Sequence, residues 1–355
     1  MKVDERKHLI LQAIVDEYIR TGEPVGSNAV LGRLDINVSS ATVRNDMAAL
    51  ESEGLLEQPH TSAGRIPTYE GFRYYIDHLM TPKPLSAKEK YLIDSLLAQG
   101  SLTIDSVVDN AVNVLAELTN LAVVSQNSMP VFSVITRVEV IPAGRRLYAL
   151  LMITSSGTVK NKICRLKFDL TYDQIHFFEQ FVNDNLLGVN VDSVTPAVLQ
   201  NLAVALGSYM MALSPLLHAA YELSEEMAKV DVHLKGEQNL LVNDLLRSDE
   251  VVSLLAHKNQ LNELLSSALD GISVVFGKEA ESFAISNSSL IVAPYRVKNE
   301  PIGSFGVIGP VRVDYAKVIP HIQYITESVS RMIADVLEEE DDDEGKEESH
   351  GQTEE

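Results

Sequence analysis

The amino-acid sequence predicts an α+β protein in which two blocks of strands are separated by a helical segment. Three observations indicate this fold class. Apolar residues recur at helical spacing through most of the first 120 residues, including 104–120. From 131 to 168, and again in "ISVVFG", "SLIVAPYRV" and "PIGSFGVIG", β-branched and aliphatic runs indicate strands. Residues 171–270 between these blocks are again mostly helical, which predicts one α+β domain with a helical insertion.

The composition is that of a soluble globular protein. Hydrophobic residues make up 45% of the chain and charged residues 22%. No apolar run reaches the roughly 18–20 residues that a membrane span needs, and the first residues do not look like a signal peptide. Cys164 is the single cysteine, which excludes an internal disulfide and a multi-cysteine zinc site. We therefore expect a cytoplasmic protein without a membrane partner.

The amino-terminal residues are ordered as a helix, a short helix, a four-residue turn and a third helix. Apolar residues four apart, such as Ile10 and Ile14, predict the first helix, which ends near "TGEPVGS". Ser27 is expected to cap the short helix, and "DINV" forms the turn. Ser39 then caps "SATVRNDMAALESE", which stops at Gly54. This order is that of a helix-turn-helix.

The third helix separates an apolar face from a face of small and hydrogen-bonding residues. Val43, Met47 and Leu50 form the stripe that we expect to be buried. The opposite face carries Ala41, Asn45, Ala48 and Ser52, flanked by Thr42, Ala49 and Arg44. Such a face suits the major groove, because asparagine can bind adenine, arginine can bind guanine or a phosphate, and alanine can meet a thymine methyl. Ser39 and Ser40 lie at the helix amino terminus, where N–H groups favour a phosphate. An ordinary surface helix is the alternative.

The segment "QPHTSAGRIPT" at 58–68 follows a short predicted strand, "LLEQP". A strand, a small glycine-containing loop and a return strand form a β-wing, from which Arg65 can reach a minor groove. Thr61 and Ser62 supply hydroxyls for phosphates, and Gly64 permits close approach of the backbone. A solvated connecting loop is the alternative, but the neighbouring helix favours a DNA-binding wing.

Two stretches resemble a known family. "SSATVRNDMAALESEGLLEQPHTSAGRIPTYEGFRYYID" resembles the signature of the heat-inducible transcription repressor HrcA family, and "GPVRVDYAKVI" is similar to its late motif. The resemblance extends to about residue 337. It implies a winged helix followed by a GAF-like domain, into which a dimerising domain is inserted. It places the recognition helix at residues 39–54 and the wing at residues 60–68.

The resemblance also implies a function. A homodimer binds an inverted repeat of double-stranded DNA upstream of chaperone operons, blocks transcription, and has a working link to a GroEL-type chaperonin. The face pattern and the resemblance together give the expected DNA-binding residues: Ser39, Ser40, Ala41, Thr42, Arg44, Asn45, Ala48, His60, Thr61, Ser62, Gly64 and Arg65.

Five segments are expected along the chain. They are a winged helix-turn-helix domain (1–82), a linker helix with Ser86 and Glu89 as its capping box (83–102), a GAF-like domain (103–168 and 245–337), an inserted dimerisation domain (169–244) and a disordered acidic tail (338–355).

The net charge of −21 is concentrated in the tail. Residues 338–355 contain eleven acidic residues and Lys346, whereas residues 1–85 contain nine Lys or Arg and twelve Asp or Glu. We expect the tail to be disordered, because it buries too little apolar surface to offset its ordering entropy. It either maintains solubility or competes with DNA for the winged helix.

No catalytic or metal-binding constellation is visible in the sequence. "GSFGVIGP" at 303–310 fits neither a dinucleotide fingerprint nor a P-loop, so we expect a strand and a turn. The nine histidines lack metal-ligand spacing, and Cys164 is expected to be buried packing. Asp46, Glu51 and Glu53 are expected to be exposed or capping charges. The sequence therefore predicts no enzyme activity, no metal and no cofactor.

A second function remains open, in which a metabolite in the GAF-like domain controls the winged helix. No convergent polar cluster identifies such a site, so a structural domain that serves dimerisation is favoured. Thermal-shift screening against metabolites distinguishes the two, because a specific ligand stabilises the folded state.

Overall fold

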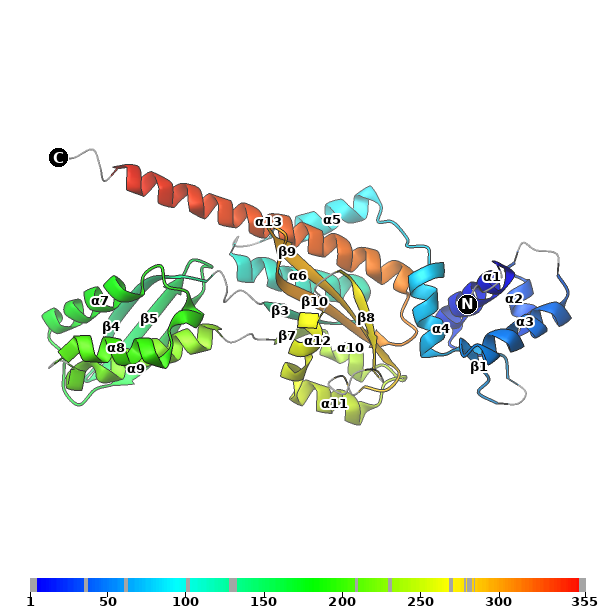
Figure 1. The fold of residues 1–355 in the computed structure, drawn as a ribbon, viewed down its shortest axis with the longest axis horizontal. Coiled ribbons are helices and arrows are strands. Elements are labelled where there is room, and N and C mark those ends of the chain that lie inside the picture. Colours follow the sequence, from blue (N-terminus) through cyan, green and yellow to red (C-terminus); the bar gives the residue numbers. More distant parts are fainter. Residues whose placement is uncertain are drawn as a thin grey trace.

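The chain folds into three units placed along the long axis of the molecule (Figure 1). We refer to residues 5–80 as the amino-terminal unit, to residues 133–228 as the inserted unit, and to the other described residues as the central unit, which lies between them. The computed structural model describes residues 5–34, 38–60, 63–99, 103–127, 133–207, 210–228, 232–267, 271–277, 279, 283 and 285–350. Over these ranges, no helix has the length and apolar character needed to cross a membrane.

The amino-terminal unit consists of three helices followed by a two-stranded antiparallel sheet. These elements are α1 (Glu5–Thr21), α2 (Ser27–Leu31), α3 (Ser40–Ser52), β1 (Leu56–Glu57) and β2 (Ile66–Pro67). The predicted succession of helix, short helix, helix and hairpin is confirmed. Ile10 and Ile14 are fully buried, as their spacing indicated.

Hydroxyl groups decide where the second and third helices begin. The Ser39 hydroxyl accepts a hydrogen bond of 3.1 Å from the Thr42 N–H, which confirms the predicted cap of α3. The predicted cap at Ser27 is wrong, because Gly26 occupies the cap position and Ser27 is the first helical residue. The buried Ser27 hydroxyl lies 3.0 Å from that of Ser40 and so packs α2 on α3. Residues 35–37 of the predicted "DINV" turn lie outside the described residues.

Helix α4 (Tyr69–Tyr74) continues as a π-helical segment (Tyr75–Leu79) that crosses α1. The Thr68 hydroxyl caps α4 by accepting a hydrogen bond from Gly71. The Tyr75 hydroxyl donates a hydrogen bond of 2.6 Å to Asp16 of α1. Burial raises the pKa of Tyr75 far above its ordinary value, with a further contribution from the Asp16 bond. The phenol therefore stays protonated and holds the two helices together.

Helix α5 (Ala87–Leu97) begins at the predicted capping box, in which Ser86 and Glu89 bond each other's backbone N–H groups. It is packed on the central unit and is not a free linker. Ile93 and Leu97 are buried, and Asp94 accepts a hydrogen bond of 2.7 Å from the Tyr324 hydroxyl.

The central unit is built on a five-stranded antiparallel sheet in the order β7-β3-β10-β9-β8. Its elements are α6 (Ile104–Thr119), β3 (Ala122–Asn127), β7 (Val232–Lys235), α10 (Glu237–Leu241), α11 (Ser248–Ala256), a 3₁₀ turn (Lys258–Gln260), α12 (Leu261–Ser267), β8 (Ser273–Phe276), β9 (Ser288–Val297), β10 (Glu300–Pro310) and α13 (Tyr315–His350). The predicted strands "ISVVFG", "SLIVAPYRV" and "PIGSFGVIG" are confirmed as β8, β9 and β10.

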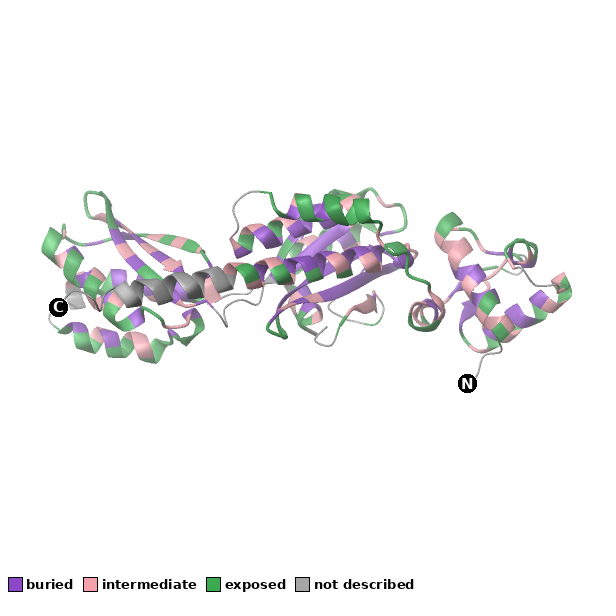
Figure 2. Ribbon diagram, turned by 90° about the horizontal axis from the view of Figure 1, so that it is seen from above, coloured by how far each residue is buried: buried purple, intermediate pink, exposed green. Residues whose placement is uncertain are grey.

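Both faces of this sheet are covered by helices, and Figure 2 shows its strands as buried. Val123 and Val307 pack in the core beneath α6 and α13. Val124 and Ile308, the next residue on each strand, pack in the core on the opposite side, with residues from α10, α11 and α12. A strand buried on both faces has apolar residues in succession, and the sequence shows such continuous apolar runs in these strands.

The inserted unit combines a three-stranded antiparallel sheet with helices on one of its faces. The strands are β4 (Ile135–Gly144), β5 (Leu147–Thr154) and β6 (Val159–Arg165), and the helices are α7 (Tyr172–Leu186), a 3₁₀ turn (Val191–Ser193), α8 (Pro196–Leu206) and α9 (Met210–Ala228). These elements share a separate hydrophobic core. Cys164 lies in that core, as predicted, and burial raises the pKa of its thiol.

The structure corrects the predicted domain boundaries at residues 168 and 244. Strands β3 and β7, which flank the insertion, pair with each other from Val123 with Lys235 to Gln126 with Val232. The insertion therefore starts after β3 and includes β4, β5 and β6, which the sequence analysis had assigned to the GAF-like domain. Strand texture identifies a strand, but it does not reveal which sheet the strand joins.

Helix α13 extends through His350, and the predicted disorder of the acidic tail (338–355) stays a prediction. Residues 351–355 lie outside the described chain. Ile325, Val329 and Ile333 are fully buried and anchor the first half of α13.

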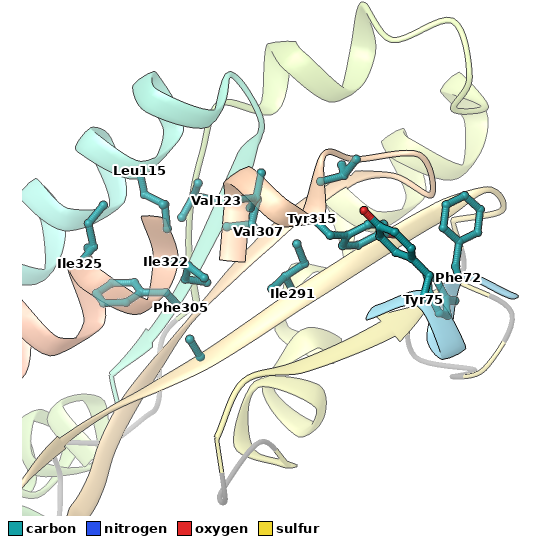
Figure 3. Close-up of a cluster of buried hydrophobic side chains, with 14 of the residues drawn as sticks. Phe72, Tyr75, Leu115, Val123, Ile291, Phe305, Val307, Tyr315, Ile322 and Ile325 are labelled. Atoms are coloured by element: carbon teal, nitrogen blue, oxygen red, sulfur yellow. The ribbon is translucent and has the colours of Figure 1, made fainter. Parts of the chain in front are cut away.

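An aromatic cluster joins the amino-terminal unit to the central unit (Figure 3). The ring of Phe72 lies 6.4 Å from that of Phe276 and 6.1 Å from that of Tyr315. The Arg73 guanidinium lies over the Phe276 ring at 5.3 Å and pairs with Glu279 at 2.6 Å. These contacts make the cores of the two units continuous.

We predict that Phe72→Ala lowers the free energy of unfolding by about 3–5 kcal/mol, because it leaves a cavity at this junction. Urea unfolding followed by circular dichroism measures the change. The control is Tyr91→Ala on α5, whose side chain is 77% exposed and which should stay within about 0.5 kcal/mol of the wild type. Equal effects of the two substitutions would contradict the role of Phe72.

Candidate nucleic-acid interface

Helix α3 presents a narrow apolar face to the protein and a polar face to solvent. Val43, Met47 and Leu50 are buried against the rest of the amino-terminal unit, which confirms the predicted stripe. The predicted opposite face is exposed, with Thr42 and Ala49 half-buried at its margins. The exposed residues of α3 on and beside that face are Ala41, Arg44, Asn45, Ala48 and Ser52.

The two serines at the start of α3 have different roles. Ser39 is exposed, and its hydroxyl lies 2.9 Å from that of Thr42 as well as capping the helix. Ser40 is half-buried, and its hydroxyl donates a hydrogen bond of 3.1 Å to the Asn28 side chain of α2. Ser40 therefore helps to fix the angle between α2 and α3, whereas Ser39 remains at the surface.

Arg44 differs from the other basic residues of the amino-terminal unit. Six Lys or Arg residues in its described part form ion pairs with carboxylates: Arg6, Lys7, Arg20, Arg33, Arg65 and Arg73. Arg44 has no carboxylate partner within that part of the chain, and its Nε donates only a 3.3 Å bond to the Ser27 hydroxyl. Arg44 and Asn45 are adjacent and exposed, so they are the groups best placed to meet a ligand.

Acidic residues on α3 serve the fold. Asp46, expected to be an exposed or capping charge, is only 7% exposed and accepts two hydrogen bonds from Arg6 of α1, at 2.7 and 3.1 Å. Glu53, the C-cap residue of α3, accepts a hydrogen bond of 3.0 Å from Lys7 of α1. These pairs bind α1 to the flank of α3. Composition alone could not reveal this, because the partners are about forty residues apart.

The hairpin after α3 is anchored at its base. Arg65 and Val25 form an antiparallel bridge in which each N–H donates to the other's carbonyl at 2.9 Å. Gly64, which is expected to let the backbone approach DNA, also packs directly against this bridge. A Cβ at Gly64 would lie 2.3 Å from the Val25 carbonyl oxygen, so only glycine fits without displacement.

Arg65 points towards α3. Its Nε and a terminal nitrogen contact one carboxylate oxygen of Glu51, at 2.9 and 2.8 Å. The Arg65 side chain is 19% exposed. The expected projection of Arg65 into a minor groove stays a prediction. In this structure a carboxylate of α3 holds its guanidinium group.

The hairpin tip contains the remaining predicted residues. His60 is exposed, and its carbonyl accepts a hydrogen bond of 2.8 Å from the Ala63 N–H. The Gln58 side chain donates a bond of 3.0 Å to the Ala63 carbonyl. Thr61 and Ser62 lie outside the described residues. Gln58 was not among the predicted site residues. Its side chain bonds across the loop and links the two ends of the hairpin tip.

We predict that Gly64→Ala destabilises the amino-terminal unit by about 1–3 kcal/mol, because the added methyl group overpacks the Val25 bridge. Thermal unfolding measures the loss. The matched control is Gly26→Ala, where an added Cβ meets no atom within 4 Å and the φ angle is −87°. If Gly64→Ala unfolds at the same temperature as Gly26→Ala, the bridge does not constrain this position.

An exposed helix face that combines small side chains with asparagine and arginine suits contact with base edges, so this site is of the DNA-binding class. Comparison with known proteins identifies the family. The model of the HrcA protein C-terminal domain matches residues 105–319. The chain is 34% identical over 343 residues to the heat-inducible transcription repressor HrcA of Clostridium botulinum strain Eklund 17B, covering 94% of this chain and 98% of that protein.

A second relative and a solved structure agree with this assignment. The heat-inducible transcription repressor HrcA of Acetivibrio thermocellus is 32% identical over 344 residues, covering 94% of this chain and 98% of the relative. The crystal structure of a hypothetical protein at 2.2 Å resolution superimposes with a TM-score of 0.64 and 26% identity, covering 94% of this chain and all of that one. The chain belongs to the HrcA family of heat-inducible transcription repressors.

Proposed function

We propose that this chain is a repressor that binds an inverted-repeat operator upstream of chaperone operons as a homodimer. In this proposal the amino-terminal unit is a winged helix, and the central unit is a GAF-like domain. The observation that carries the proposal is the exposed face of α3. It combines small side chains with Asn45 and with Arg44, the basic residue that has no carboxylate partner in the described amino-terminal unit.

The spacing of the exposed residues suits a helix lying in a major groove. Ala41 and Ala48 each lie three or four residues from both Arg44 and Asn45, so the four side chains occupy one side of α3. Arg44 and Asn45 supply donors and an acceptor for base edges, while the alanines allow close approach. The amino terminus of α3, at Ser39, is then near a phosphate, as helix N–H groups favour.

We predict that Arg44→Ala and Asn45→Ala each weaken operator binding by about 1–3 kcal/mol, which is the value of one base contact. Fluorescence anisotropy measures binding to the duplex that footprinting identifies upstream of the chaperonin and co-chaperone genes. Arg20→Ala is the control, because it removes the same charge from the end of α1, where Arg20 is paired with Glu17. A loss no larger than that of Arg20→Ala would contradict the assignment of α3.

The inserted unit offers a surface for the second copy of the chain. Helices α7 and α9 pack against its strands on one side, and the side chains of the opposite sheet face remain at the surface. Ile163 and Val159 of β6 are 58% and 53% exposed. Ile141 of β4 is also exposed and lies in register with Ile163, with Ala149 of β5 between them. Pairing two such faces buries apolar area and gives the two-fold symmetry that an inverted repeat requires.

We predict that Ile163→Asp converts the dimer to monomers, because a charge in an apolar interface is not compensated. Sedimentation velocity measures the association state. Val204→Asp on α8 is the control, because Val204 is 74% exposed but belongs to a helix and not to this sheet face. A dimer that persists with Ile163→Asp, or dissociates equally with Val204→Asp, would place the interface elsewhere.

Heat control needs a change in the amount of active repressor. We propose that warming unfolds or aggregates the repressor and that a GroEL-type chaperonin returns it to the DNA-binding state. Membership of the heat-inducible repressor family motivates this mechanism.

We predict that operator binding is lost after a heat step and recovers more completely when chaperonin and ATP are added. Anisotropy before and after the step measures the active fraction, and chaperonin without ATP is the control. Binding that survives heating and gains nothing from chaperonin would exclude this mechanism.

A further inference from the structure

We infer that Arg65 is a positioning residue, whose guanidinium group holds the β1–β2 hairpin beside α3 and does not itself bind DNA. The inference rests on the proposed function, because it concerns how the DNA-binding surface is assembled. Arg65 lies at the start of the return strand, directly before β2 (Ile66–Pro67), and not at the hairpin tip.

The backbone of Arg65 is fixed by contacts to two other segments. The backbone N–H and C=O of Arg65 both form hydrogen bonds with the backbone of Val25, which lies in the connection between α1 and α2. Gly64 is packed directly under the same residue. Strand β2 follows immediately and pairs with β1 through Glu57 and Ile66. The backbone at Arg65 therefore cannot move outward without breaking this small sheet.

The side chain of Arg65 connects the hairpin to the last turns of α3. Two of its nitrogens contact Glu51, and the Glu51 side chain is itself only 36% exposed. Hydrogen bonds between charged groups are about twice as strong as neutral ones. To reach DNA, Arg65 would have to give up both contacts and leave a half-buried carboxylate without its partner.

Arg44 has no such constraint. It would give up one 3.3 Å bond to a neutral hydroxyl, and it is already exposed. The two arginines of the predicted interface thus have different roles. Arg44 is available to the ligand, whereas Arg65 holds the hairpin, which also carries His60, against the last turns of α3.

The two possible roles of Arg65 predict opposite changes in DNA affinity when Glu51 is neutralised. If Arg65 positions the hairpin, neutralising Glu51 releases the hairpin and weakens DNA binding. If Arg65 contacts DNA, neutralising Glu51 frees the guanidinium group and removes a nearby negative charge, so binding becomes tighter. Glu57→Gln is the control for the loss of one negative charge. Glu57 is an exposed acidic residue of β1, and it forms no ion pair within the described chain.

The experiment measures binding of the full chain to the footprinted inverted-repeat duplex for the wild type, Glu51→Gln, Arg65→Gln, the double variant and Glu57→Gln. We expect Glu51→Gln and Arg65→Gln each to weaken binding about tenfold relative to Glu57→Gln, the order of one lost charged hydrogen bond. The double variant should be no weaker than the weaker single variant. Tighter binding by Glu51→Gln, unchanged binding by both, or additive losses would overturn the inference.

The salt dependence of binding provides a readout that a simple loss of stability does not change. Each phosphate contact contributes about 0.9 to the slope of log affinity against log salt concentration. We expect Arg65→Gln to keep the wild-type slope, and a slope lower by about one would show that Arg65 binds a phosphate. Arg65→Lys, which keeps the charge, serves as the second variant, and thermal unfolding confirms that each variant is folded at the assay temperature.

Failure of the proposed function gives a different result. If the wild type binds the footprinted duplex no better than a scrambled duplex of equal length, the chain does not recognise that operator, whatever happens at Glu51 and Arg65. If the wild type binds and Arg44→Ala does not, the function stands, and the variants of Glu51 and Arg65 decide the positioning role alone.

Discussion

The contact of Phe72 with Phe276 and Tyr315 is the interaction on which the arrangement of the molecule depends. It makes one continuous core from the amino-terminal helices to the five-stranded sheet, and Arg73 reinforces it by pairing with Glu279. A second contact between the units lies in the segment between the π-helical turn and α5. There Lys83 bonds Ala316 through its backbone N–H and Asp314 through its side chain. The orientation of α3 is thereby fixed relative to the sheet that carries the insertion. Two copies joined through the insertions would present their α3 helices at a defined separation, as an inverted repeat requires.

Internal ion pairs explain how an acidic protein can present a surface to a polyanion. Residues 1–85 contain more acidic than basic residues. Most of the Lys and Arg side chains in the described amino-terminal unit form ion pairs with carboxylates of the same unit. Side chains already paired with a carboxylate contribute little to the binding of a ligand. Arg44, on the exposed face of α3, remains available to bind one. In the proposed interface, which basic side chain lacks a carboxylate partner therefore matters more than the net charge of the chain.

Sequence patterns were sufficient for local structure and insufficient for pairing. Helical spacing predicted α3 and its buried stripe of Val43, Met47 and Leu50, and the Ser86 capping box predicted the start of α5. The short strands β3 and β7 were missed, and with them the limits of the insertion, because four to six residues carry little periodic signal.

The sequence by itself determined the family, the α+β class and the polar face of α3, because these depend on residues close together in the chain. Only the tertiary structure decided what each charged side chain does. Arg44 and Arg65 have the same side chain and both lie in the predicted interface, yet Glu51 holds Arg65, and no carboxylate in the described chain holds Arg44. Likewise, Gly64 is required by Val25, a residue thirty-nine positions earlier that approaches it only in the folded state. The physical reason is that an ion pair or a steric clash depends on distance in space, which the spacing of residues along the chain does not specify.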